Sequence, residues 1–144
     1  MWIYNGETLP EDLIPELAIG FIYLIECQVN NKKYIGKKLL TKSGGFKTVK
    51  GKRKRKPRKA SDWLKYYGSC TELKEDVKVM GEHAFKRTVI MFCDTQSMLN
   101  YQEAKLQYKH EVLESDTWYN ANIVSRVYKK NILGKLSNKE IIVV

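Results

Sequence analysis

The pair of apolar segments at residues 20–27 and 32–36 constrains the fold more than any other part of the chain. The first segment, GFIYLIEC, is apolar over the length of one strand, which is typical of a strand buried on both faces. Two asparagines lie between the segments and favour a turn, because asparagine tolerates positive φ. The second segment, KKYIG, has the length of a partner strand. The sequence therefore predicts an antiparallel hairpin whose strands carry Tyr23 and Tyr34.

Patterns downstream of the hairpin predict an α+β fold, with a small three-stranded antiparallel sheet flanked by helices. Leu73, Val77 and Met80 have helical spacing, and Gly81 is a typical residue just after a helix end. The predicted elements are a short helix through Trp63 and Tyr66 capped by Ser61 or Asp62, a helix over 71–81, a strand over 85–93 and the longest helix over 97–113.

Three segments fall outside these elements, although the length predicts a single domain over 1–144. The N-terminal lead, 1–19, contains two prolines and predicts little regular structure. The insertion at 39–60 is rich in Gly, Lys and Arg and has neither a helical nor a strand period, which predicts a long exposed basic loop. The C-terminal tail, 124–144, ends in IIVV, which is compatible with an added strand.

Positive charge is concentrated in one segment. Eight of the chain's 26 lysines and arginines lie in KGKRKRKPRK, residues 50–59, and the rest of the chain has 18 basic against 16 acidic side chains. A near-neutral globule with one basic segment indicates a polyanionic partner, although a solvated loop or a localisation signal is the alternative. Eight phosphate contacts would give a salt dependence of binding with a slope of roughly −7.

The composition excludes several other classes of protein. Three cysteines and two histidines without metal-ligand spacing argue against a structural zinc site and against a disulfide framework. No apolar run approaches the length of a membrane span, and the N-terminal sequence has no secretion signal, so we expect no membrane partner. Free thiols fit a reducing compartment, and we expect a cytoplasmic protein.

One acidic residue lies in the apolar stripe of the longest predicted helix. Glu103 shares a face with Leu99, Leu106, His110 and Leu113 by their spacing, so we expect it to point toward the core or into a cleft. An unpaired carboxylate there would tend to stay protonated, whereas a divalent cation or a basic partner would keep it charged. The spacing leaves open a partly exposed glutamate and a buried salt bridge.

The two strand tyrosines also have two interpretations. Tyrosines in β-strands usually pack against neighbouring side chains and have no catalytic role. For a tyrosine to act as a general base, nearby cations such as Lys37 or Lys38 would have to lower its pKa from about 10.

Five blocks of the sequence, in order, resemble one family. Gly20-Phe21-Ile22-Tyr23 followed by Tyr34-Ile35-Gly36 resembles the two-part signature of the GIY-YIG nuclease superfamily, with Phe-Ile-Tyr in place of Gly-Ile-Tyr. The segment 66–85 resembles the YGS…L…G…F block of its phage-type members. Glu103 falls on the helix that carries the family's metal-binding glutamate, and Tyr119-Asn120 matches its YN. The pieces KKYIGKK, SDWLKYYGS, NYQEAK and WYN are similar to Seg-type phage endonucleases, and the likeness covers roughly 19–123.

The resemblance implies a Mg²⁺- or Mn²⁺-dependent endonuclease that acts on double-stranded DNA, encoded by a phage and homing-like. In such a site Tyr23 would act as general base or position the attacking water, and Tyr34 would orient that water and the phosphate. Glu103 would bind the single divalent ion, which polarises the scissile phosphate and stabilises the leaving 3′ oxygen. Asn120 would support the site by hydrogen bonding.

One feature of the family has no aligned counterpart here, namely an arginine on the helix after YIG with a histidine or tyrosine one turn later. Lys38 is the first candidate for the phosphate-clamping cation, before Arg58 and Lys37. Tyr67 is the candidate for the aromatic slot, closely followed by Tyr66. The residues expected to contact DNA are Lys37, Arg53, Arg55, Lys56 and Arg58.

The missing arginine leaves open a second function, a catalytically inactive nucleic-acid-binding protein with the same fold. A nuclease of the His-Asn-His type would need more histidines. A nuclease of the Asp-Glu-Lys type would need its Glu-x-Lys on a strand, whereas both such pieces here lie on predicted helices. The sequence does not choose an oligomeric state or a DNA target.

Overall fold

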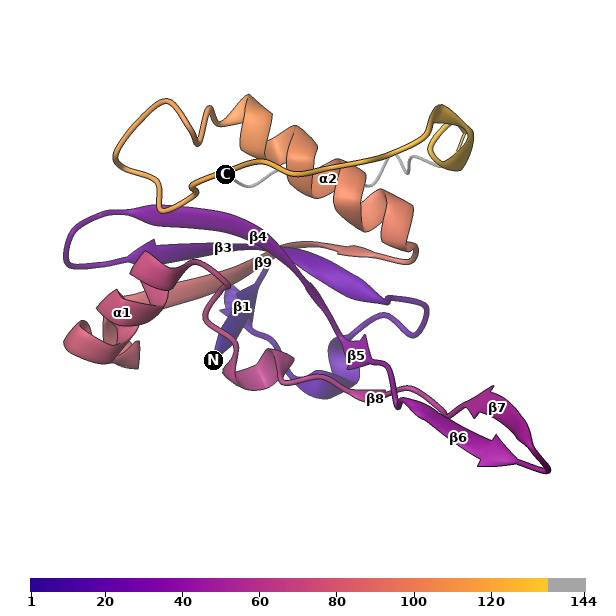
Figure 1. Ribbon diagram of the computed structural model, residues 1–144. Helices are drawn as coiled ribbons and strands as arrows, with labels where there is room; N and C mark the ends of the chain where they lie inside the picture. Colours follow the sequence, from indigo (N-terminus) through magenta and orange to yellow (C-terminus); the bar gives the residue numbers. More distant parts are fainter. Residues whose placement is uncertain (135–144) are drawn as a thin grey trace.

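The hairpin predicted over 20–36 forms one side of a five-stranded sheet in the computed structural model, which describes residues 1–134 (Figure 1). β3 (Gly20–Cys27) pairs antiparallel with β4 (Lys33–Leu39), and β4 is an edge strand of the sheet. β3 also pairs antiparallel with β9 (Phe85–Cys93), which has the bounds expected from the sequence. The α+β class and these three strands are confirmed.

The prediction of a three-stranded, wholly antiparallel sheet is wrong, because the N-terminal lead adds two strands. β1 (Trp2–Tyr4) runs parallel to β9, and β2 (Glu7–Thr8) pairs antiparallel with β1, so the strand order is β2-β1-β9-β3-β4 and the sheet is mixed. Asn5 and Gly6 join the first two strands with φ of 52° and 80°. Asn-Gly is a strong signal for a two-residue hairpin turn. The two prolines that follow favoured the prediction of little regular structure instead.

Two helices lie on opposite faces of this sheet, as Figure 1 shows. α1 (Thr71–Met80) packs on the face that carries Trp2, Phe21 and Tyr23, and α2 (Gln96–Lys109) packs on the other. The short 3-10 helices are η1 (Glu11–Leu13), η2 (Trp63–Lys65), η3 (Glu82–Ala84) and η4 (Lys129–Asn131).

The expected helix over 97–113 is shorter at its C-terminal end. α2 stops at Lys109 because Glu111 has positive φ, 51°, which breaks the helical path. Leu113 is consequently 50% exposed and does not belong to the apolar stripe. Leu99 and Leu106 are buried as predicted. At the other end, the Thr95 hydroxyl accepts a hydrogen bond from the Met98 backbone N–H at 3.1 Å, which caps the helix.

The insertion at 39–60 contains paired strands and is not a loop without regular structure. β5 (Thr41–Lys42) pairs with β8 (Lys59–Ala60), and β6 (Phe46–Val49) pairs with β7 (Lys52–Arg55). Lys50 and Gly51 both have positive φ, which fits a type I′ turn between β6 and β7. We call residues 41–60 the basic ribbon. Figure 1 shows it projecting from the sheet, away from both helices.

The expectation of a strand in IIVV falls at 141–144, outside the described residues. Within 1–134, no helix has the length and the apolar character needed to cross a membrane.

Candidate active site

The candidate site lies at the free edge of β4, where the backbone groups of every second residue face away from the sheet. The chain after α2 covers the first of these residues. Lys33 donates its N–H to the Thr117 carbonyl at 2.9 Å, and its own carbonyl accepts from the Tyr119 N–H at 2.7 Å. This pairing brings the Tyr119-Asn120 segment against the strand that carries Tyr34.

Asn120 occupies the next position along the edge. Its Oδ1 accepts from the Ile35 N–H at 3.2 Å, and its Nδ2 donates to the Ile35 carbonyl at 2.8 Å. Gln107 of α2 donates to the same carbonyl at 2.9 Å. Asn120 is buried, so these bonds satisfy backbone groups that water cannot reach. The asparagine therefore fixes the edge strand and holds the chain after α2 against it.

Glu103 lies at the following position of the edge. Its side chain is 13% exposed, and its Oε1 is 3.7 Å from the Nζ of Lys37. The Lys37 ammonium also donates to Asn100 Oδ1. Burial raises the pKa of Glu103, while Lys37 opposes that rise through its charge and through hydrogen bonds from its ammonium and its backbone N–H. Glu103 thus faces inward as expected, with a basic partner of its own chain beside it.

Tyr23 reaches this edge from the neighbouring strand because Gly36 lies opposite it in β4. A Cβ added to Gly36 would lie 2.5 Å from the Tyr23 hydroxyl oxygen, so only glycine lets the phenol lie across the strand. Tyr23 is 1% exposed and stacks between Trp2 and Tyr66, with ring centroids 5.5 and 5.9 Å away. Burial raises its pKa well above the ordinary value, and Tyr34, Tyr66 and Glu103 add to the rise.

Tyr34 is more accessible than Tyr23. Its hydroxyl lies 3.1 Å from the Ser69 hydroxyl, and its ring centroid is 6.0 Å from that of Tyr23. Burial raises its pKa, the Ser69 hydrogen bond lowers it, and the negative charge of Glu103 raises it again. Glu103 therefore acts electrostatically on both phenols, although Tyr34 and Lys37 belong to opposite faces of the strand. The site wraps around the sheet edge.

The structure brings Tyr66, rather than Tyr67, to this site. Tyr66 stacks on Tyr23, and the Lys38 ammonium lies 4.1 Å from the Tyr66 ring centroid. Tyr67 instead packs under Arg87, whose guanidinium carbon is 4.2 Å from its ring centroid. Sequence spacing could not separate two adjacent tyrosines that point to different neighbours.

The candidate clamping cations have different partners. Lys38 lies 2.6 Å from Asp62 Oδ1, and Lys37 contacts Glu103. Arg58 donates from Nε and Nη2 to the Thr41 hydroxyl and carbonyl, each at 2.9 Å, at the base of the ribbon. Both lysines are therefore close to the edge site, and Arg58 is fixed beside it.

Arg87 is a buried residue that the sequence analysis did not single out. Its Nη1 donates to the Leu64 and Tyr66 carbonyls at 3.1 and 2.8 Å, and its guanidinium lies over the Trp2 ring at 4.5 Å. These bonds hold the segment that places Tyr66 on Tyr23. An arginine within a predicted strand, FKRTVIMFC, two residues after Phe85 and two before Val89, was the available signal.

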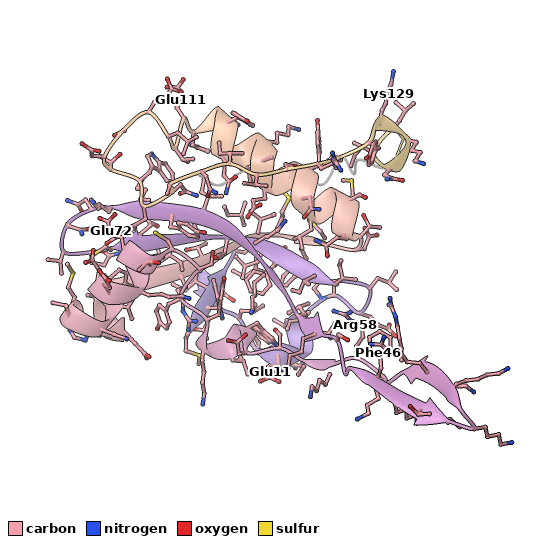
Figure 2. The ribbon with its side chains drawn as sticks, in the orientation of Figure 1. Glu11, Phe46, Arg58, Glu72, Glu111 and Lys129 are labelled. Atoms are coloured by element: carbon pink, nitrogen blue, oxygen red, sulfur yellow. The ribbon has the colours of Figure 1, made fainter. Side chains whose placement is uncertain are left out.

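A cationic groove of about 470 Å³ begins at the edge site and leads to the ribbon. Its charged lining consists of Lys37, Lys38, Lys42 and Arg58. The other residues expected to contact DNA, Arg53, Arg55 and Lys56, are exposed on the ribbon. Figure 2 shows Arg58 and Phe46 in the part of the ribbon nearer the sheet. Lys37 and Arg58 thus line the groove, and the other predicted contacts are exposed on the ribbon.

The donor set at the edge fits a weakly held, hard divalent cation. Among residues 1–134, no three His, Cys, Asp or Glu side chains gather to enclose a metal. Mg²⁺ commonly binds one or two carboxylates and completes its shell with water and substrate phosphate. Glu103 offers such a single carboxylate, and its Lys37 partner would have to move aside.

Comparison with known proteins identifies the family of the chain. The family model described as "Putative endonuclease segE, GIY-YIG domain" matches residues 2–123. No curated protein and no solved structure matches the chain.

Proposed function

Because the chain belongs to the segE-type GIY-YIG endonuclease family, a family of nucleases, we propose that it hydrolyses phosphodiester bonds of double-stranded DNA at the β4 edge with the help of Mg²⁺ or Mn²⁺. The observation that carries the proposal is the convergence of Tyr23, Tyr34, Glu103 and Asn120 around Ile35–Lys37. These side chains come from β3, β4, α2 and the segment after α2.

Glu103 would hold the cation. A divalent ion there would polarise the scissile phosphate and stabilise the leaving 3′ oxygen. When Glu103 takes this role, the Lys37 ammonium loses its 3.7 Å partner, keeps its hydrogen bond to Asn100 and can donate to a phosphate oxygen next to the cut. Lys38 lies on the other side of the strand and would contact the adjacent phosphate.

The environment of Tyr23 favours a positioning role over a general-base role. Its raised pKa keeps the phenol protonated at neutral pH. A protonated phenol donates a hydrogen bond and also accepts one, so Tyr23 can orient the attacking water across Gly36. Tyr34, held by Ser69 at 3.1 Å, would fix the same water or the phosphate from the more exposed side.

The groove of about 470 Å³ supports binding of a polyanionic strand, since its charged lining is cationic. A duplex that follows the groove would pass from the edge site to the ribbon, where Arg53, Arg55, Lys56 and Arg58 extend the basic surface. A phage-encoded, homing-like role remains the prediction made from the sequence.

Cleavage of supercoiled plasmid by the purified protein in Mg²⁺, Mn²⁺, Ca²⁺ or chelator tests the proposal. We expect nicking or cutting in Mg²⁺ and Mn²⁺ alone, and a loss of at least about 100-fold in Glu103→Gln. Glu75→Gln, on the exposed side of α1, is the matched control and should cleave like the original protein. Unchanged cleavage by Glu103→Gln would overturn the assigned mechanism.

A catalytically inactive nucleic-acid-binding protein is the second candidate. The observation that favours it is the pairing of Lys38, the first candidate to replace the family's arginine, with Asp62 at 2.6 Å. This function predicts salt-sensitive DNA binding and no cleavage with any divalent cation in the plasmid assay.

A further inference from the structure

We infer that the end of the basic ribbon, the β6–β7 hairpin, enters the major groove of duplex DNA with its phenylalanine–arginine face toward the base edges and its lysine face toward a phosphate backbone. The inference rests on the proposed function only in taking duplex DNA as the partner. It assigns a readout role to a part of the molecule that contributes nothing to the edge site.

The hairpin has two chemically different faces because of its register. Phe46 lies opposite Arg55 and Thr48 opposite Arg53, and residues that are directly opposite share a face of a two-stranded ribbon. The intervening pairs, Lys47 with Lys54 and Val49 with Lys52, occupy the other face. One face therefore carries both arginines and the only aromatic ring, and the other carries lysines.

The ring of Phe46 organises the arginine face. The guanidinium carbons of Arg53 and Arg55 lie 4.0 and 5.8 Å from its ring centroid. Phe46 is 46% exposed and belongs to neither buried core cluster, so its ring is not explained by core packing. A guanidinium held against a ring has fewer conformations to lose when it binds guanine O6 and N7 through two hydrogen bonds. Phe46 itself can contact a thymine methyl group.

Like charges on the hairpin destabilise the pairing of its two strands when no anion is bound. Lys47 and Lys54 are directly opposite each other, an arrangement that destabilises a strand pair. Residues 41–60 contain no acidic side chain to compensate. A phosphate backbone beside this face would remove the repulsion, which is the argument for placing the lysines at the backbone and the arginines at the bases.

The width of a two-stranded ribbon fits the major groove of duplex DNA and not the minor groove. At about 12 Å wide, the major groove admits a two-stranded ribbon, whereas the minor groove, at about 6 Å, does not. The ribbon's base is also well fixed, because the Lys56 N–H donates to the Gly45 carbonyl at 2.9 Å and Arg58 binds Thr41 twice. A Cβ on Gly44 would collide with the Pro57 carbonyl oxygen, so the two chain segments of the ribbon approach closely there.

Because the ribbon is fixed where it joins the sheet, the nucleotides that it recognises should lie at a constant distance from the cleaved bond. The eight residues from Lys42 to Val49 can reach at most about 28 Å, which corresponds to about 8 base pairs. We therefore expect the preferred bases to lie within about one helical turn of the cut, at a constant offset.

Selection of binding sites from a pool of random 30-base-pair duplexes tests the inference. The selection uses Glu103→Gln, so that it does not depend on cleavage. We expect enrichment of a motif that contains guanine, protection of guanine N7 from dimethyl sulfate within that motif, and about 10-fold weaker binding when 7-deazaguanine replaces guanine there. In a Glu103→Gln background, Arg53→Lys with Arg55→Lys keeps the charge and should abolish the enrichment.

The matched control on the other face is Lys47→Gln with Lys54→Gln in the same background. It should weaken binding equally on all duplexes, lower the salt slope by about 2 and keep the motif. The inference is overturned if no motif is enriched, if the arginine variant selects the same motif, or if adenine N3 is protected while guanine N7 is not. Absence of plasmid cleavage would instead count against the proposed catalytic function. The result of the binding-site selection could still be interpreted in that case.

Discussion

The β4 edge and the basic ribbon are both rich in polar groups, but they are built in opposite ways. At the edge, Tyr23, Asn120 and Ile35 are buried, and each outward-facing backbone group at Ile35 has a named partner. In the ribbon, β7 is exposed throughout, and β6 and β7 have only each other as strand partners. The edge is fixed by the core, whereas the ribbon is fixed only by its base and its own register.

This difference teaches where each kind of variant should act. Changes at the edge should alter both stability and cleavage, because the same contacts serve both. Changes in the ribbon should alter binding and leave the free energy of unfolding nearly constant, because surface substitutions usually change it by less than about 0.5 kcal/mol.

Gly36→Ala should have the largest effect. The new Cβ would lie 2.5 Å from the Tyr23 hydroxyl oxygen and 2.8 Å from Tyr34 Cε1, so both phenols must move. We expect about 1–3 kcal/mol of lost stability from overpacking and at least about a 100-fold slower cleavage, measured by denaturant unfolding and plasmid nicking.

Gly51→Ala in the ribbon turn is the matched control for that substitution. Its Cβ would meet nothing within 4 Å, although φ there is +75°. The strain should cost about 1 kcal/mol locally and leave the global unfolding midpoint unchanged. Equal midpoint shifts in the two alanine variants would break the comparison between edge and ribbon.

Neutralising the ribbon with Arg53→Gln, Arg55→Gln and Arg58→Gln should give the next largest effect, chiefly on binding. Three lost phosphate or base contacts would reduce the salt slope by about 2.7, which is about a 40-fold change across a fourfold range of salt. Fluorescence titrations at 50 and 200 mM salt measure this slope. An unchanged slope would mean that the ribbon does not contact DNA.

Asn120→Ala should be milder than Gly36→Ala because no atoms collide. The substitution removes both hydrogen bonds between the Asn120 side chain and the Ile35 backbone. The buried Ile35 N–H then loses Asn120 Oδ1 as its acceptor. We expect about 1–3 kcal/mol of lost stability. Slower cleavage should accompany it, because the strand that carries Tyr34 loses its support. Thermal melts with and without DNA, alongside the nicking rate, measure both. A stable variant with normal cleavage would show that Gln107 alone fixes the edge.

Glu103→Gln should produce the smallest stability change, and with the opposite sign. Burial raises the folded-state pKa of Glu103, so at neutral pH the ionised carboxylate destabilises the folded protein relative to the unfolded one. The glutamine variant should be more stable by on the order of 1 kcal/mol at pH 7. The gain should shrink as the pH falls from the raised pKa of Glu103 toward the ordinary glutamate pKa, because below the ordinary pKa the carboxyl is protonated in both states. Urea unfolding from pH 4 to 8 checks this, and a less stable variant at pH 7 would show that the ion pair with Lys37 outweighs burial.

The sequence predicted best those elements whose signals are local. The bounds of β9 and α1 followed from apolar runs and from Gly81, and the inward direction of Glu103 followed from the spacing of Leu99 and Leu106. The N-terminal strands were missed because β1 is only three residues long and pairs with a strand far along the chain. No local pattern records such a pairing.

The candidate site shows the same limit. The residues that meet at the edge could be named from motifs, but their partners could not. That Lys37 faces Glu103 while Lys38 faces Tyr66 depends on the alternation of β4 between two covered faces. The choice between Tyr66 and Tyr67 depends on Arg87, a buried cation that sequence patterns alone do not place.

The parallel pairing of β1 with β9 has a consequence for the order of folding. Trp2 packs against Tyr23 from a strand whose partner lies about 85 residues later. Closing so long a segment is entropically costly and slows folding, and it requires β9 to have been synthesised. While the chain emerges from the ribosome, the stretch from Gly20 to Leu39 can close its own hairpin early. The stack of Trp2 on Tyr23 can form only later, so the aromatic packing of the candidate site is a late product of folding and is absent from partly made chains.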